Sequence, residues 1–176
     1  MSGGMPRRFQ ILTPSFFHVI NRAAHRDRLF DTPRDYLAFL EVLNRAHQEH
    51  PVPLLAYCVM PNHFHLVVGP TITRALSPFM HRLTLTHGKR WHAHRGTRGT
   101  GPVYQGRFKA LLIGDDGHFL TVCRYVERNP LEAELVRRAE EWPWSSLNPR
   151  QRDFGVVLSP WPVPRPHSWL ELVNGE

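Results

Sequence analysis

The sequence predicts an α+β fold of the ferredoxin-like type: one antiparallel sheet with helices packed on one face and an additional C-terminal helix. Two observations indicate this class. Strand-like and helix-like runs follow one another in the order β-α-β-β-α-β, and a further amphipathic run follows the last strand. Only three residues separate the two middle strands, which is typical of an antiparallel hairpin. The 176 residues are enough to bury a core without a disulfide or a structural metal.

The first strand and helix are indicated by residue type and by a capping pattern. Residues 16–21 form a short β-prone run. Thr32 can act as an N-cap, Pro33 suits the first helical position, and Asp35 stands three residues after the cap. The buried stripe of this helix repeats at helical spacing and consists of Tyr36, Phe39, Leu40 and Leu43.

The central hairpin joins strands over residues 54–59 and 63–68. Its turn is Met60-Pro61-Asn62, in which proline presets the first corner and asparagine tolerates the second. Ser77-Pro78 then resembles a cap followed by a first-turn proline, which predicts a basic amphipathic helix ending near His94.

The last elements of the domain follow a glycine-rich loop. A strand is predicted over 108–113, and Asp115 caps a helix that we expect to end at Pro130. The apolar side of this helix contains Phe119, Val122, Cys123 and Val126. The composition then shifts, so that residues 1–147 form the domain and 148–176 a proline-rich tail anchored by Trp161 and Trp169. One hypothesis is that this tail covers the active site.

The charge distribution points to a polyanionic partner. The chain has 22 basic and 15 acidic residues, a net charge of +7, and a pI near 10.2. No acidic residue occurs between Glu49 and Asp115. This acid-free segment carries eight basic residues, which are Arg74, Arg82, Lys89, Arg90, Arg95, Arg98, Arg107 and Lys109. Such a field favours nucleic acid, although a solvated basic face that only maintains solubility is the alternative.

Other classes of protein are disfavoured. No run of 18 apolar residues could span a membrane, and the N-terminus lacks the apolar segment of a secretory signal. Cys58 and Cys123 lie far apart in apolar segments, so we expect both to be reduced core residues of a cytoplasmic protein.

The pair His63 and His65 is the first candidate for chemistry. Side chains two apart on a strand point the same way, with Cα atoms about 6.6–6.8 Å apart, so both imidazoles could reach one metal ion. Phe64 between them would point into the helix layer. The alternative is that these are two of the chain's 12 histidines and bind nothing.

Tyr125 is the second candidate. On a helical projection it falls to the side of the apolar stripe, on the same flank as His118 and Asn129, whereas a core tyrosine would sit nearer the centre. A tyrosine packed at the edge of the core remains the alternative. Arg124 and Arg128 lie on the outward side of this helix and could contact phosphates.

Four stretches together resemble the REP-associated tyrosine transposases. They are Met60-Pro61-Asn62-His63-Phe64-His65-Leu66-Val67-Val68, Val103-Tyr104-Gln105-Gly106-Arg107-Phe108-Lys109, Arg124-Tyr125-Val126-Glu127-Arg128-Asn129-Pro130 and Trp142-Pro143-Trp144-Ser145-Ser146. These enzymes belong to the single-tyrosine HUH transposases, in which U is a bulky apolar residue, here Phe64. The resemblance runs from about Phe16 to Leu147.

The resemblance implies a function and a set of site residues. Tyr125 would be the nucleophile, and His63, His65 and Asn129 would hold Mg²⁺ or Mn²⁺. The substrate would be single-stranded DNA with palindromic hairpins, cleaved and rejoined through a 5′-phosphotyrosine bond by a monomer associated with the nucleoid. The residues expected to contact DNA are Arg82, Lys89, Arg90, Tyr104, Arg107, Lys109, Arg124 and Arg128. A hairpin-binding protein without catalysis, or an initiator or relaxase-like nickase, are the alternatives.

Overall fold

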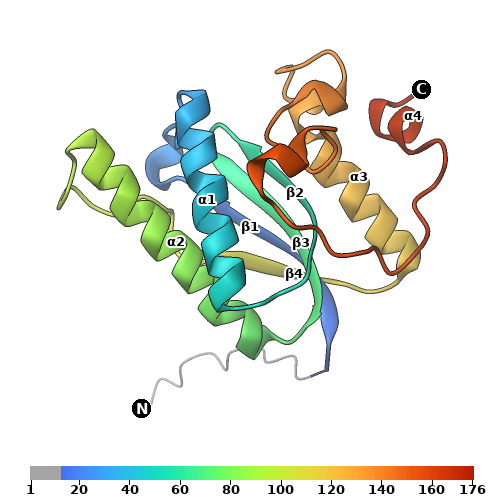
Figure 1. Ribbon diagram of the computed structural model, residues 1–176, viewed down its shortest axis with the longest axis horizontal. Helices are drawn as coiled ribbons and strands as arrows, with labels where there is room; N and C mark the ends of the chain where they lie inside the picture. Colours follow the sequence, from blue (N-terminus) through green and yellow to red (C-terminus); the bar gives the residue numbers. More distant parts are fainter. Residues whose placement is uncertain (1–12) are drawn as a thin grey trace, which may run out of the picture.

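The computed structural model describes residues 13–176 (Figure 1). The first twelve residues, with the segment judged not to be a secretory signal, lie outside the described part. The strands are β1 (Ser15–Arg22), β2 (Leu54–Met60), β3 (His63–Thr71) and β4 (Lys109–Ile113). The α-helices are α1 (Pro33–Glu49), α2 (Thr73–Arg95), α3 (Asp116–Glu132) and the short α4 (Trp169–Asn174). Short 3₁₀ turns cover Ala24–Arg26, Ala139–Glu141 and Gln151–Phe154.

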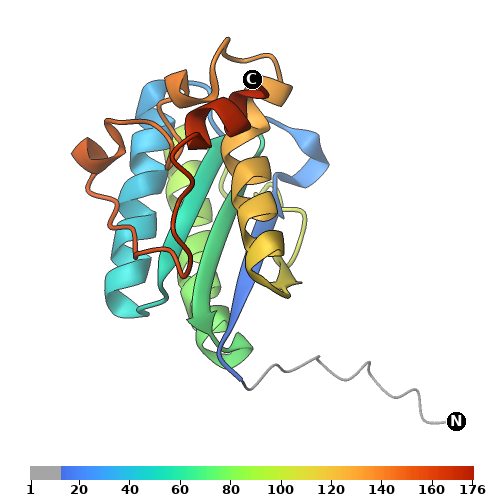
Figure 2. The ribbon, with the colours of Figure 1, turned by 90° about the vertical axis from the view of Figure 1, so that its right-hand side faces the viewer.

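The four strands form one antiparallel sheet in the order β2-β3-β1-β4, which confirms the predicted ferredoxin-like α+β fold. Helices α1 and α2 lie on one face, as expected, and α3 crosses the other face (Figures 1 and 2). The face opposite α1 and α2 is therefore not open along its whole length. Instead, α3 and the C-terminal segment cover part of it.

The alternation of side chains along β3 assigns its residues to the two faces. Phe64 is fully buried in the core beneath α1 and α2, as predicted. His63 and His65 point to the opposite face, which α3 covers. The hydrophobic residues on that second face include Ile113, Phe119 and Cys123.

The helix boundaries confirm two of the predicted starts and correct one start and one end. Thr32 forms a capping box with Asp35, and Asp115 accepts a hydrogen bond from the backbone N–H of His118. Helix α2 begins at Thr73 and not after Ser77, whose hydroxyl donates instead to the Thr73 carbonyl.

The sequence suggested that Pro78 begins one helix and Pro130 ends another, but both prolines lie inside their helices. Pro78 lies in the second turn of α2, and α3 continues two residues past Pro130, to Glu132. A proline this close to a helix end forfeits about one backbone hydrogen bond, and packing of the helix on the sheet can outweigh that loss.

The proline-rich tail is part of the packed structure. Before it, the segment 144–146 pairs with the outer edge of β2, where the Val59 N–H donates to the Trp144 carbonyl. Trp161 then donates from Nε1 to the Leu55 carbonyl at 2.9 Å, and Trp169 is buried against α3. Both tryptophans therefore anchor the tail, as predicted, and the tail covers one edge of the sheet and part of the α3 face.

Cys58 and Cys123 are both buried and unpaired. Within residues 13–176, no helix has the length and apolar character needed to cross a membrane.

Candidate active site and nucleic-acid interface

The two histidines lie side by side on β3, immediately after the hairpin turn. Their ring centroids are 4.8 Å apart, with the ring planes at 85°. His65 is 1% exposed and His63 is 9% exposed. The pair is therefore a compact, largely desolvated group on an interior strand, at the end of the sheet where the hairpin turns.

Tyr125 reaches this pair from α3. Its ring centroid lies 5.6 Å from that of His65 and 5.9 Å from that of His18 on β1. The side chain remains 51% exposed, so its hydroxyl is not enclosed in the core. Asn129, one helical turn further along α3, hydrogen-bonds to the His63 ring. The fold thus brings together Tyr125, Asn129 and the two histidines, as the resemblance implied.

Each histidine is oriented by a second polar side chain through its Nδ1. His63 Nδ1 lies 2.6 Å from Asn62 Oδ1, which can only accept a hydrogen bond. His65 Nδ1 lies 2.9 Å from His18 Nε2. His65 Nε2 is buried and has no hydrogen-bond partner among the described residues.

The electrostatic environment keeps these imidazoles neutral. Burial, with a smaller contribution from the Arg22 guanidinium, lowers the pKa of His63 to about 4. Burial and then the neighbouring histidines lower the pKa of His65 well below its usual value. Burial and His118 lower the pKa of His18 to about 4. Neutral imidazoles are the form that binds metal ions.

The donor set suits a divalent cation. A buried ring nitrogen without a partner is costly unless something coordinates it, and His65 Nε2 is such an atom. The amide oxygen of Asn129 suits both Mn²⁺ and Mg²⁺, and the two imidazoles favour Mn²⁺, the softer of the two ions. No cluster of three or more His, Cys, Asp or Glu side chains is placed to hold a metal ion in the part of the chain that the structure describes. Any cation here would therefore depend on the amide and on DNA oxygens.

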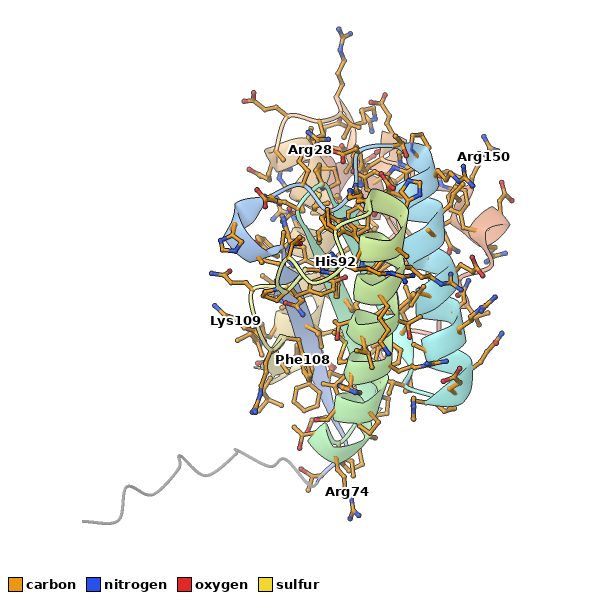
Figure 3. All side chains as sticks on the ribbon, turned by 90° about the vertical axis from the view of Figure 1, so that its left-hand side faces the viewer. Arg28, Arg74, His92, Phe108, Lys109 and Arg150 are labelled. Atoms are coloured by element: carbon orange, nitrogen blue, oxygen red, sulfur yellow. The ribbon has the colours of Figure 1, made fainter. Side chains whose placement is uncertain are left out.

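A basic hollow of about 360 Å³ adjoins the histidines along β1 and β4. Arg22 stands directly across from His63 in the sheet, and Lys109 stands across from Ile20. Arg107 and Gln105 complete the lining. Figure 3 shows Lys109 at this edge of the molecule. These residues present positive charge beside the candidate site.

Sequence reasoning missed His18 and Arg22. They are four residues apart on β1, so both point to the same face of the sheet as the histidine pair. The alternation of side chains along the first strand could have shown that they share a face. It could not have shown that this strand pairs with the strand of the histidines.

The structure places Arg82 and Arg90 away from this site. Arg82 forms an ion pair with Glu49, and Arg90 forms one with Glu41, so both link α2 to α1 on the opposite side of the sheet. Lys89 is exposed on the same helix. These contacts give Arg82 and Arg90 a structural explanation that the sequence pattern did not suggest.

Arg124 and Arg128 hold the C-terminal segment. Arg124 Nε donates to the Leu172 carbonyl at 2.7 Å, and Arg128 donates to the Val173 carbonyl at 2.6 Å. Arg128 is also paired with Glu132. These guanidinium groups therefore already have partners at the end of α4.

The half-exposed Tyr125 shows that the tail does not bury the candidate site.

Tyr104 is not available for base stacking in this structure. It is 7% exposed, and its hydroxyl lies 2.6 Å from His87 Nδ1 in the core under α2. Phe108 is partly buried and lines a hollow of about 1030 Å³ beside α2, together with Arg74 and Arg107. Figure 3 labels Phe108 and Arg74 near this helix. Trp144 packs flat against Tyr36, with centroids 4.8 Å apart, as a packing residue.

A ferredoxin-like sheet with an HUH histidine pair, faced by one tyrosine from a crossing helix, defines the class of single-tyrosine HUH transposases. The sequence model of the family described as "Transposase IS200 like" matches residues 13–129. This match covers about two thirds of the chain, so the protein belongs to that family.

Two relatives agree with this assignment. A REP-associated tyrosine transposase of Haemophilus influenzae is 23% identical over 145 residues, which cover 77% of this chain and 80% of the relative. A solved structure of a REP-associated tyrosine transposase bound to a REP hairpin covers 92% of this chain and 93% of its own. It has a TM-score of 0.59 at 20% identity, so the two proteins share their fold.

Proposed function

We propose that this protein cleaves and rejoins single-stranded DNA beside REP-type hairpins, with Tyr125 as the nucleophile and a divalent cation as a helper. One observation carries the proposal. Tyr125 is half exposed and lies against His65, whose buried Nε2 has no partner among residues 13–176. A reactive hydroxyl and an unsatisfied ligand nitrogen thus meet at one surface.

The chemistry follows from these groups. The Tyr125 hydroxyl attacks a phosphorus atom of the DNA backbone, and the bond from that phosphorus to the 3′ oxygen breaks. The phenolic proton is lost, and the leaving 3′ oxygen gains a proton. The products are a 5′-phosphotyrosine and a free 3′-OH. Because the new ester keeps the energy of the phosphodiester, the reverse attack by a 3′-OH rejoins the strand without ATP.

His63, His65 and Asn129 would hold the cation, Mn²⁺ or Mg²⁺. When bound, it supplies charge neutralisation at the phosphoryl oxygens and helps to align them. Helix α3 brings Tyr125 to the histidine pair of its own chain, so the proposed reaction needs no residue from a second copy, and we propose a monomer as the acting unit.

The hairpin substrate is proposed from the relatives and from charge. One solved relative is bound to a REP hairpin, and in this chain Arg22, Arg107 and Lys109 line one hollow, with Arg22 directly across the sheet from His63. Phosphates of the strand that enters the site would lie along these three residues.

The direct test uses the purified protein, Mn²⁺ and a panel of labelled oligonucleotides that form REP-type hairpins. We expect a covalent protein–DNA adduct on a denaturing gel that disappears when the cation is chelated. Tight, salt-sensitive binding without any adduct would instead indicate a hairpin-binding protein. Cleavage of origin-like sequences in preference to hairpins would indicate a replication nickase.

The interface makes a separate prediction about salt. Replacing Arg107 or Lys109 with alanine should weaken hairpin binding and reduce the slope of log affinity against log salt by about 1 for each phosphate that the protein no longer neutralises. Arg82→Ala is the matched control, because Arg82 lies on the opposite face of the sheet from the candidate site, where it is paired with Glu49. Fluorescence anisotropy at several salt concentrations measures the slopes. Equal slopes for all three variants would show that the strand runs elsewhere.

A further inference from the structure

His18 is a buried histidine on β1 that no part of the proposed reaction uses. It is 5% exposed and lies on the same face of the sheet as the histidine pair. Its ring centroid is 5.1 Å from that of His65, and the two planes are within 26° of each other. Because His18 Nε2 and His65 Nδ1 are 2.9 Å apart, the two rings meet through these nitrogens.

The contact between the two histidines has two possible proton arrangements. If His18 donates, His65 carries its own proton on Nε2, where it is buried and unpaired. If His65 donates from Nδ1, its Nε2 carries a lone pair directed away from His18. Only the second arrangement leaves a nitrogen that can coordinate a cation.

His63, the neighbouring candidate ligand, also has its Nδ1 against a polar atom of another side chain. His63 Nδ1 faces the Asn62 oxygen at 2.6 Å, and an amide oxygen accepts only. The proton of His63 is thereby assigned to Nδ1, and its Nε2 is left as the lone-pair nitrogen. Two separate side chains, Asn62 from the turn and His18 from β1, therefore lie against the same ring nitrogen, Nδ1, of the two histidines.

We propose that His18 is a positioning residue for the cation site, whose Nε2 accepts the Nδ1–H of His65 and so fixes the tautomer and ring orientation of that ligand. The inference rests on the proposed function, because it assigns His65 Nε2 to the cation. His18 is not itself a ligand here, since the nitrogen it presents to the pair is already engaged by His65 Nδ1.

Two variants of His18 separate its hydrogen bond from its volume. His18→Phe keeps a ring of similar size but offers no acceptor, whereas His18→Gln retains an oxygen that can accept from His65. Val19→Ala is the matched control, because Val19 is the next residue on β1 and is fully buried on the opposite face. Thermal unfolding identifies any variant that has lost the fold.

The first measurement is nitrogen-15 NMR of the histidine rings in metal-free protein, with His65 assigned by comparison with His65→Ala. We expect His65 to carry its proton on Nδ1 in the wild type and in Val19→Ala, and to lose this preference in His18→Phe. A proton on Nε2 of His65 in the wild type would overturn the inference.

The second measurement is the affinity for Mn²⁺ alone, from the electron paramagnetic resonance of the free ion. We expect His18→Phe to bind about 10–100-fold more weakly and His18→Gln to recover most of that loss. Wild-type affinity in His18→Phe would overturn the role of His18 and leave the proposed site intact. No Mn²⁺ binding by the wild type would overturn the cation site itself, whatever the tautomer of His65.

Discussion

Replacing Tyr125 with phenylalanine is expected to abolish covalent attachment to DNA and leave hairpin binding nearly unchanged. The substitution removes one oxygen atom from a ring that is half exposed and that contacts His18 and His65 through its face and edge. Since the ring remains, the local packing should persist. Loss of the proposed nucleophile should reduce adduct formation by about 10³-fold or more.

The chain offers a matched control for this change. Tyr57→Phe removes the same oxygen from a tyrosine that is fully buried on β2, in the core below α1 and α2. Its hydroxyl has no hydrogen-bond partner within the described residues, so its loss should not reduce stability. We expect wild-type adduct formation from Tyr57→Phe. If Tyr125→Phe still forms the adduct at the wild-type rate, another residue is the nucleophile and the proposed mechanism is wrong.

Local sequence rules placed the candidate residues on particular faces of their strand and helix, whereas only the resemblance to the REP-associated tyrosine transposases implied that they form one site. Period-two alternation in β3 placed His63 and His65 on one face, and the helical projection moved Tyr125 off the apolar stripe of α3. The capping residues Thr32 and Asp115 were also identified, because a cap depends on only three or four neighbouring positions.

Long-range pairing explains most of what could not be predicted. His18 and His65 are 47 residues apart, and only the β1–β3 register brings their nitrogens together. In the same way, the acid-free segment suggested Arg82 as a DNA contact, and only the packing of α1 against α2 shows that it is paired with Glu49. A basic residue in an acid-free segment can find its carboxylate on a distant helix, so charge patterning alone does not define an interface.

Glu127 is a second position where a large effect is expected, because it ties α3 to two other parts of the structure. The side chain is fully buried. Its Oε1 accepts from the Ser146 hydroxyl and its Oε2 accepts from Trp169 Nε1, both at 2.7 Å. The Ser146 hydroxyl in turn accepts from the Tyr57 N–H on β2. One carboxylate thus links the helix of Tyr125 to the sheet edge and to α4.

Glu127→Ala should reduce the free energy of unfolding by about 3–5 kcal/mol, since it leaves the buried donors of Ser146 and Trp169 without an acceptor. This is a large part of the stability of an ordinary domain. Urea denaturation followed by tryptophan fluorescence measures it. A loss below about 1 kcal/mol would show that these donors find other partners.

Glu127→Gln keeps an acceptor oxygen and should recover much of the stability, in a way that depends on pH. Burial raises the pKa of Glu127, against the opposing effects of Trp169, Arg165 and Ser146. The folded protein therefore holds this proton more tightly than the unfolded chain does. The stability that this tighter proton binding provides is fully present below the pKa of Glu127 in the unfolded chain. It is lost as the pH rises through the pKa of Glu127 in the folded protein. Glu127→Gln, which does not titrate, should gain stability relative to the wild type between pH 4 and 7.5. A constant difference across that range would mean that the carboxylate is ionised as easily in the folded protein as in water, and that its three partners fully offset its burial.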